Sequence, residues 1–226
     1  ILNSSGKKAY ALGNIGKSFC ENVEKIKEDE IAVLEVSSFQ LESIKEFRPY
    51  IASCLNVTPD HFERHKNIGN YALAKFNVFI NQDADDCAIL NYDDEITKNF
   101  SNMISSNAFY TSVRHTVRGA FLREGKIYLN IDREREFMSI EDIPLQGDYN
   151  YQNVMTAILT CRLLGVESKD IISAIKNFQP PRYRNQFIGY RFGKKFFNDS
   201  KATNIDSTIK ACKSMGDKTA LIVGGY

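Results

Sequence analysis

The hydrophobic positions of this 226-residue chain form short runs rich in Ile, Val and Leu, separated by segments with helical spacing. The runs at 31–36, 51–55 and 87–90 predict strands that are covered on both faces, as in parallel sheets. Between them, segments 39–47 and 71–80 predict helices. This alternation predicts an α/β fold in which helices flank a mostly parallel sheet with right-handed crossovers.

The second half of the chain departs from this alternation. Two runs with period-two alternation within 120–131 surround Glu124-Gly125 and predict an antiparallel hairpin. Pro180-Pro181 cannot continue a helix and marks a domain boundary. Around that boundary we expect helices at 151–164, ended by Gly165, and at 168–178, then a hairpin of 187–190 and 195–197 around Gly193, a helix at 205–215 and a strand at 219–223.

Composition excludes several classes of protein. With 29 Lys and Arg against 28 Asp and Glu, the net charge is +1, which excludes a globally basic nucleic-acid binder. No apolar run approaches the roughly 20 residues that cross a bilayer. The five cysteines are odd in number and contain no C-x-x-C pair, so neither a disulfide framework nor a structural zinc site is expected. We therefore expect a cytoplasmic protein without nucleic-acid or membrane partners. A monomer is also expected, although composition does not bear on this.

The ends of the sequence suggest a longer parent. The chain begins Ile-Leu-Asn without a starter methionine, and it stops after a strand-like run that leads into Gly224-Gly225-Tyr226. In α/β proteins such a run normally continues into a helix. The sequence is thus interpreted as an internal piece of a larger protein.

The first candidate for chemistry is Glu35-Val-Ser37-Ser38-Phe-Gln40, at the carboxyl end of an apolar run. Ligands bind at this edge of open α/β sheets. The alternative is structural, with Ser38 as a helix N-cap and Glu35 as a strand-end charge that reaches solvent.

The second candidate, Asn56 to His65, holds two of the three histidines. His61 could bind a cation or position a nucleophile, or it could be a structural histidine. Thr58-Pro59 is also typical of a helix start. His65 is expected at the surface.

The third candidate is Lys75, whose neighbours are nearly all apolar and which shares a helical face with Tyr71. Its ammonium could extend to solvent along the helix surface. Alternatively, carbon dioxide could carbamylate the amine and turn it into an oxygen ligand for a metal.

The fourth candidate is the polar run 197–204, which follows a predicted strand and precedes a predicted helix, a setting that suits an anionic ligand. In contrast, Ser5-Gly6-Lys7-Lys8 lacks the G-x-x-x-x-G-K-[ST] pattern of a phosphate loop and is dismissed.

Taken together, these segments resemble the Mur ligases of peptidoglycan synthesis, and among them the D-glutamate-adding member. The resemblance rests on motifs that occur in the family's order along the whole chain: Gly13-Asn-Ile-Gly16, Glu35-Val-Ser-Ser-Phe-Gln-Leu-Glu42, Asn56-Val-Thr-Pro-Asp-His61, Tyr71-x-x-Ala-Lys75, Gly147-x-x-Asn150-x-x-Asn153 and Asn198-Asp-Ser-Lys-Ala-Thr-Asn204.

The resemblance implies a P-loop-like Mur ligase central domain at 1–181, incomplete at its N-terminus, and at 182–226 the start of a second, Rossmann-like α/β domain. The family's Gly-rich phosphate loop would lie upstream of Ile1, so this piece alone is expected to be inactive. The implied activity is ATP-driven amide formation between UDP-N-acetylmuramoyl-L-alanine and D-glutamate through an acyl phosphate, with Mg²⁺.

The resemblance also implies roles for individual residues. Glu35, His61 and carbamylated Lys75 would hold magnesium, and His61, Lys75 and Lys201 would serve catalysis. Asn150, Asn153, Arg184 and Asp199 would bind the nucleotide. Asn14, Ser37, Gln40 and Thr203 would bind substrates.

Two differences from the family's pattern affect the nucleotide contacts. Tyr149 stands where a histidine is common, and Tyr183 and Gln186 flank Arg184 where a histidine and a glutamate are common. Two other functions are considered: a metal-dependent hydrolase that uses Glu35, Asp60 and His61, and a non-catalytic ligand-binding scaffold.

Overall fold

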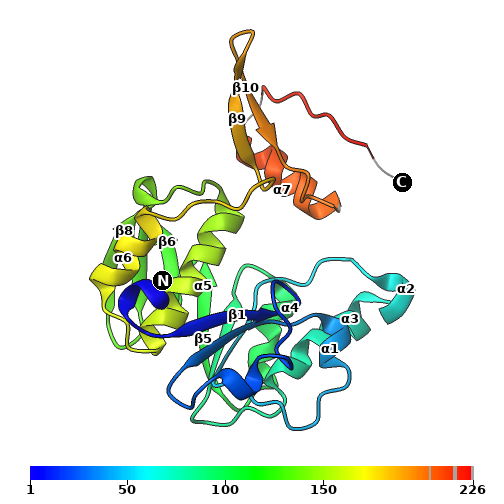
Figure 1. Ribbon diagram of the computed structural model, residues 1–226, viewed down its shortest axis with the longest axis vertical. Coiled ribbons are helices and arrows are strands. Elements are labelled where there is room, and N and C mark those ends of the chain that lie inside the picture. The colour runs from blue at the N-terminus through cyan, green and yellow to red at the C-terminus, as the bar shows by residue number, and fades with distance from the viewer. Residues whose placement is uncertain (204, 216–217, 225–226) are drawn as a thin grey trace.

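The computed structural model describes residues 1–203, 205–215 and 218–224. Asn204, the last residue of the Asn-Asp-Ser-Lys-Ala-Thr-Asn motif, and the closing Gly225-Tyr226 lie outside these ranges. Figure 1 shows a main body from which a smaller C-terminal part projects.

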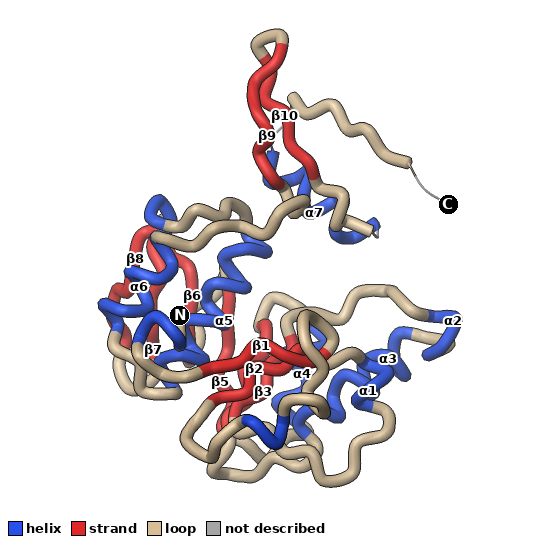
Figure 2. The backbone as a smooth tube through the Cα atoms, viewed as in Figure 1, coloured by secondary structure: helices blue, strands red, loops and turns tan. Residues whose placement is uncertain are grey.

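A mixed six-stranded sheet forms the centre of the main body (Figure 2). Its strand order is β3-β4-β5-β6-β7-β8, with parallel pairing from β3 to β6 and antiparallel pairing from β6 to β8. The expected hairpin is confirmed: Glu124 and Gly125 join β6 to β7 with φ angles of 50° and 72°, as a two-residue turn requires. The strands are β3 (Ile51–Cys54), β4 (Cys87–Asn91), β5 (Asn107–Ser112), β6 (Gly119–Arg123), β7 (Lys126–Asn130) and β8 (Glu134–Ser139).

Strands β1 (Ala9–Gly13) and β2 (Ile31–Glu35) form a separate two-stranded parallel sheet. The predicted strand at 31–36 is therefore confirmed, although it pairs with β1 and not with the main sheet. This small sheet ends at Gly13 and Glu35, which lie opposite each other.

Helices cover both faces of the main sheet. They are α1 (Ser38–Leu41), α2 (Phe62–His65), α3 (Ile68–Phe76), α4 (Glu95–Asn99), α5 (Asp148–Leu163) and α6 (Ser168–Lys176), with 3-10 turns η1 (Asn3–Ser5), η2 (Val23–Lys25), η3 (Asn77–Phe79), η4 (Phe100–Asn102) and η5 (Ile140–Asp142). The helix expected at 39–47 is wrong beyond Leu41. Side-chain amides take up carbonyls of that segment: Asn77 bonds the Leu41 carbonyl, and Asn81 bonds those of Lys45 and Phe47.

Two apolar cores lie on opposite faces of the sheet. Ile89 of β4 belongs to the core that contains Met155 and Ile158 of α5. Its neighbours along the strand, Ala88 and Leu90, belong to the core formed with α1, α3 and η4. This alternation follows from the period of two along a strand. Ala88, Ile89 and Leu90 are all at most 1% exposed, so β4 is covered on both faces.

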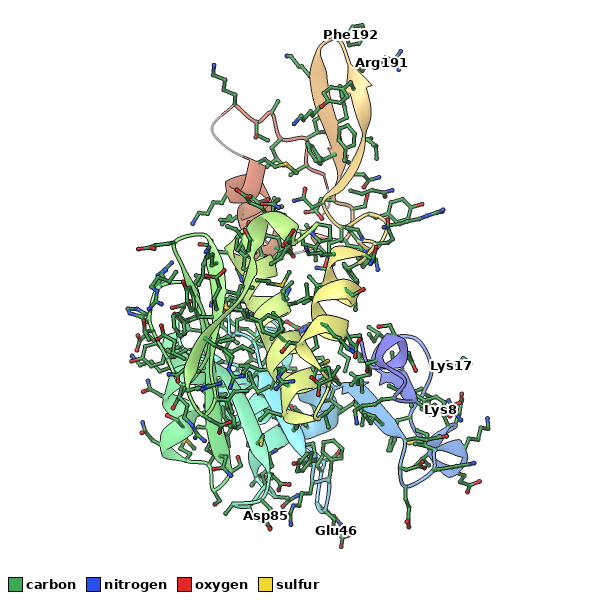
Figure 3. All side chains as sticks on the ribbon, turned by 90° about the vertical axis from the view of Figure 1, so that its left-hand side faces the viewer. Lys8, Lys17, Glu46, Asp85, Arg191 and Phe192 are labelled. Atoms are coloured by element: carbon green, nitrogen blue, oxygen red, sulfur yellow. The ribbon has the colours of Figure 1, made fainter. Side chains whose placement is uncertain are left out.

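The C-terminal part consists of the antiparallel pair β9 (Gln186–Arg191) and β10 (Lys194–Asn198) and helix α7 (Ile205–Met215). The predicted hairpin and helix are thus confirmed. The predicted strand at 219–223 is wrong: this segment has no strand pairing among the described residues, and Ile222 is 94% exposed. An apolar run forms a strand only where a neighbouring strand accepts its hydrogen bonds. In Figure 3 the hairpin tip, marked by Arg191 and Phe192, lies far from Glu46 and Asp85.

Candidate functional site

The ends of β1 and β2 bring Asn14 and Glu35 together. Gly13 has a φ of 104°, and a Cβ at this position would lie 2.3 Å from the carbonyl oxygen of Glu35. Only glycine allows the strands to approach so closely. The Asn14 backbone N–H donates to that carbonyl at 2.7 Å, and its side chain donates to Glu35 Oε1 at 3.2 Å. Glu35 is exposed at the strand end, as the structural alternative expected.

Ser37 and Gln40 form the N-terminus of α1. Ser37 is the N-cap: its hydroxyl accepts from the Gln40 N–H at 3.3 Å, and its own N–H donates to Gln40 Oε1 at 2.9 Å. This is a capping box. The expectation that Ser38 caps the helix is therefore wrong, because the cap is one residue earlier and Ser38 is the first helical residue.

His61 lies at the N-terminus of α2, with its backbone in the left-handed region at a φ of 54°. Its N–H donates to Asp60 Oδ1 at 2.9 Å, and its Nδ1 lies 3.5 Å from Glu63 Oε1. The ring contacts Phe39 at 5.1 Å between centroids. The helix start expected at Thr58-Pro59 is wrong, because α2 begins only at Phe62 with His61 as its N-cap.

His65, expected at the surface, is 4% exposed. Its Nε2 lies 2.9 Å from the hydroxyl of Ser38, and its Nδ1 lies 3.3 Å from Glu42 Oε1. The ring stacks on Phe39 at 5.4 Å. The expectation of a surface residue is wrong because the ring packs against Ser38 and Phe39 of α1 and Tyr71 of α3, and such long-range packing is not visible in the local sequence.

Lys75 lies on α3 and is half-buried. Its Nζ donates to the backbone carbonyl of Asn56 at 3.1 Å and lies 4.9 Å from the centroid of the Tyr71 ring, which is within the range of a cation–π contact. The amine therefore has an acceptor inside the protein. It is held at the segment that follows β3, next to the motif that carries His61.

Cys54, the last residue of β3, shares this environment. Its Sγ lies 3.9 Å from the Asn56 carbonyl that Lys75 also contacts. Burial raises the pKa of the Cys54 thiol to about 11, although the charge of Lys75 opposes the shift. The thiol is therefore protonated and unreactive at neutral pH.

The three proposed magnesium ligands are only partly brought together. His61 and Lys75 both contact the ring of Tyr71, His61 at 6.1 Å between centroids. Glu35 contacts Asn14 at the end of the small sheet. Across the described ranges, no group of three His, Cys, Asp or Glu side chains is placed to hold a metal.

Asn150 and Asn153 lie in the first turns of α5. Asn150 is 6% exposed and donates to the carbonyl of Gln146 at 2.8 Å, whereas Asn153 is exposed. Gly147 precedes the helix with a φ of 99°, so a glycine suits this position.

Sequence reasoning missed Gln152, which lies between these two asparagines and is 8% exposed. Its Nε2 donates to Asn91 Oδ1 at 3.0 Å and to Asp93 Oδ2 at 2.6 Å. Asp93 also accepts from the hydroxyl of Ser112. The first turns of α5 are thereby fixed to the carboxyl ends of β4 and β5. The only local signal is Asn91-x-Asp93 after an apolar strand.

The candidate residues of the C-terminal part lie in two adjoining loops. The Asn185 N–H donates to Asp199 Oδ1 at 2.8 Å, and the Lys201 N–H donates to the Tyr183 carbonyl at 3.1 Å. Arg184 is thus brought beside Asp199 and Lys201 through the backbone. Arg184, Lys201 and Thr203 are exposed.

One residue lies close to both groups of nucleotide-binding candidates, the group on α5 and the group in the C-terminal loops. Ser214 of α7 accepts from Asn185 Nδ2 at 3.1 Å, and its Cβ lies 3.0 Å from where a Cβ on Gly147 would be. Asn185 Oδ1 is buried, and within the part of the chain that the structure describes no group donates to it. The sequence reasoning had not selected Asn185 or Ser214.

The fold and the arrangement of these motifs define a member of the Mur ligase family. The Mur ligase middle domain model matches residues 14–161, which is more than half of the chain, and the chain therefore belongs to this family. The α/β fold expected from the sequence, a mostly parallel sheet with an antiparallel hairpin, is confirmed, and the sheet is a mixed one of six strands.

The particular relatives carry one name. UDP-N-acetylmuramoylalanine–D-glutamate ligases from Koribacter versatilis, Thermoanaerobacter sp. (strain X514) and Clostridioides difficile (strain 630) are 41%, 38% and 37% identical to this chain. Each alignment takes in 100% of this chain and 50% of the relative. The chain thus spans about half the length of the curated relatives it matches.

Solved structures share the fold at low sequence identity. MurF from Acinetobacter baumannii matches with a TM-score of 0.68 and 16% identity, over 94% of this chain and 55% of that one. A UDP-N-acetylmuramoyl-L-alanyl-D-glutamate–2,6-diaminopimelate ligase matches with a TM-score of 0.69 and 18% identity, over 95% and 49%. Within the described ranges, no helix combines the length and apolar character needed to cross a bilayer.

Proposed function

We propose that the full-length protein adds D-glutamate to UDP-N-acetylmuramoyl-L-alanine at the expense of ATP, as a cytoplasmic, monomeric enzyme. The observation that carries the proposal is the match, along the whole chain, to relatives that bear the name of this ligase at 36–41% identity. It is also supported by the position of Asn14 and Glu35 at the carboxyl ends of β1 and β2, since ligands bind at this edge of α/β sheets.

In the proposed reaction, the carboxylate of UDP-N-acetylmuramoyl-L-alanine attacks the γ-phosphorus of ATP, and ADP leaves. The amine of D-glutamate then attacks the resulting acyl phosphate, an amide bond forms, and phosphate leaves. Positioning and electrostatic stabilisation account for most of the catalysis of phosphoryl transfer. Lys201 is exposed, so its ammonium is free to approach a negatively charged group.

The nucleotide would be held by Asn150 and Asn153 of α5 and by Arg184 and Asp199 of the C-terminal loops. One feature fits this role. Gly147 lets Ser214 of α7 approach the start of α5 closely, and Ser214 also accepts from Asn185 in the C-terminal loops, so the two groups of candidates lie on adjoining segments. The substrate carboxylate and sugar would meet Asn14, Ser37, Gln40 and Thr203.

Glu35, His61 and Lys75 fit magnesium only after Lys75 is carbamylated. Glu35 offers a carboxylate and His61 an imidazole, but an ammonium has no lone pair for a metal. If the neutral amine of Lys75 attacks carbon dioxide, a C–N bond forms, a proton is released, and the carbamate oxygens become ligands of the kind that magnesium prefers. Bound magnesium would neutralise charge on the transferring phosphoryl group.

We propose the domain boundary at residue 181, with the central domain at 1–181 and the C-terminal domain from 182. The turn to β9 begins directly after Pro180-Pro181, and the matched middle-domain region ends before it, at residue 161. The isolated 226-residue chain is expected to have no ligase turnover.

The test is ADP release by full-length protein, measured with UDP-N-acetylmuramoyl-L-alanine and a series of amino acids. We expect release that needs both D-glutamate and the muramoyl substrate. Turnover with another amino acid, and none with D-glutamate, would refute the substrate assignment while leaving the ligase chemistry intact. Metal-dependent phosphoester hydrolysis without either substrate would favour a hydrolase.

A further inference from the structure

The buried histidine His65 has no role in the function proposed above, yet it contacts both segments that carry candidate residues. Ser38 and Glu42 belong to the segment that follows β2, together with Ser37 and Gln40. His65 belongs to the segment that follows β3, together with His61. The side chains of Ser38, His65 and Glu42 form a continuous chain of contacts between these two segments.

The two contacts of the His65 ring favour one direction along this chain. Nδ1 lies 3.3 Å from Glu42 Oε1 in an ion-pair contact, and a carboxylate only accepts, which favours a proton on Nδ1. With the proton there, Nε2 accepts from the hydroxyl of Ser38 at 2.9 Å. Arg64 donates to the same carboxylate at 2.6 Å, and this hydrogen bond lowers the pKa of Glu42, which keeps it an acceptor.

The arrangement of serine, histidine and glutamate is that of a nucleophilic triad, but burial excludes this role. Ser38 and His65 are 6% and 4% exposed, so no substrate carbonyl can reach the hydroxyl. The contacts of Ser38, His65 and Glu42 instead fix the distance between α1 and α2.

The aromatic rings around His65 connect it to the candidate catalytic residues. His65 lies between Phe39, at 5.4 Å, and Tyr71, at 5.0 Å. Both of these rings also contact His61, and Tyr71 lies under the ammonium of Lys75. A shift of the His65 ring would therefore displace the surroundings of both His61 and Lys75.

We propose that His65, held by Ser38 and Glu42, is a positioning residue that fixes His61 and Lys75 relative to Ser37 for the ligase reaction. The proposal rests on the proposed function. It names residues that touch neither substrate nor nucleotide and that act through the two rings.

The first experiment needs no turnover. Two-dimensional ¹H–¹⁵N spectra of the histidine rings of full-length protein report which nitrogen carries the proton. We expect the Nδ1–H form for His65, with Nε2 unprotonated, and a change in the His61 signals in Ser38→Ala/His65→Phe. A protonated Nε2 on His65 would overturn the proposal.

The second experiment separates kcat from KM in the same full-length protein. The double variant Ser38→Ala/His65→Phe keeps the ring stack and leaves no buried hydroxyl without a partner. We expect kcat to fall by about 10–100-fold, as for other displaced catalytic groups, with the KM for ATP unchanged because the nucleotide candidates lie on α5 and the C-terminal loops. His65→Gln, which keeps a donor and an acceptor, should retain more activity than His65→Phe.

The matched control is His115→Phe. His115 is the third histidine of the chain, is exposed, and contacts Tyr92 away from these residues, so turnover should not change. A double variant that turns over at the wild-type rate would overturn the positioning role. In contrast, wild-type protein that is inactive with D-glutamate would refute the proposed function, and the ring spectra would still test the hydrogen bonds.

Discussion

The ammonium of Lys75 lies over the face of the Tyr71 ring, with Nζ 4.9 Å from the ring centroid. Tyr71 precedes Lys75 by one helical turn, so the contact is fixed by the helix itself. Because Tyr71 is 7% exposed, its ring cannot move away, and the amine is held where it also meets the Asn56 carbonyl. The position of Lys75 is thus set by a rigid helix and not by a mobile loop.

Removal of this amine is the first test of the proposed site. In full-length protein, Lys75→Ala should abolish measurable turnover, because it removes the amine that is proposed to form the carbamate. Lys98→Ala is a matched control, since Lys98 also lies over a tyrosine ring, that of Tyr92, at 4.5 Å. Ligase assays on both variants should show loss only for Lys75→Ala. Wild-type rates in that variant would exclude the carbamate from the mechanism.

Gly13→Ala should destabilise the protein strongly. A φ of 104° strains any side chain, and the new Cβ would lie 2.3 Å from the Glu35 carbonyl oxygen, so we expect a loss of about 2–5 kcal/mol in the free energy of unfolding. Gly6→Ala, at a φ of 84° with open space around the Cβ, should lose only about 1 kcal/mol. Denaturant unfolding of both variants measures the difference, and equal losses would mean that β1 and β2 are not in close contact.

The buried thiol of Cys54 predicts a loss of stability at high pH. Burial raises its pKa from 9.0 to about 11, so the folded state keeps the proton that the unfolded state releases. The resulting stabilisation is fully present below pH 9 and is lost as the pH rises through about 11. It amounts to about 3 kcal/mol.

Denaturant unfolding between pH 8 and 11 would measure this effect. The slope attributable to Cys54 should be absent in Cys54→Val, which has no titratable group. At pH 8 the exposed thiol of Cys20 should react with iodoacetamide in the folded protein while Cys54 does not. Rapid alkylation of Cys54 under native conditions would contradict its burial.

Gln152→Glu should weaken the attachment of α5 to the sheet. The new carboxylate would replace the amide that donates to Asp93 Oδ2 at 2.6 Å, which removes a buried hydrogen bond and places two like charges together. We expect a loss of about 1–3 kcal/mol at neutral pH. Part of this loss should be regained when the pH is lowered enough to protonate one carboxylate, and thermal unfolding across pH 4–8 would show whether this occurs.

Local signals in the sequence predicted the fold well where a few neighbouring residues decide the structure. The apolar run Cys87 to Leu90 predicted a doubly covered strand, and Glu124-Gly125 predicted a hairpin turn, because both signals lie in a few neighbouring residues. The end of α1 at Leu41 depends on Asn77, more than thirty residues away. No periodicity within 39–47 reveals that contact.

The candidate site shows the same limit. Sequence reasoning expected Glu35 at a strand end, His61 in the segment after a strand and Lys75 on a helix. Whether these three residues approach each other depends on packing between the small sheet and the main one. The burial of His65 and the contact between Gln152 and Asp93 both join segments distant in sequence. Such contacts leave no local trace, so residue type alone assigned His65 to the surface.

Ser214 limits how closely α7 of the C-terminal part can approach Gly147 of the main body. Its Cβ, which is fixed by the backbone of α7, lies 3.0 Å from where a Cβ on Gly147 would be, and its hydroxyl donates to the Ala211 carbonyl and accepts from Asn185. A side chain added at residue 147 would clash with Ser214 and displace α7 from the start of α5. The separation between Asn150 and Arg184 would then increase, and nucleotide affinity would become a direct readout of that hinge opening.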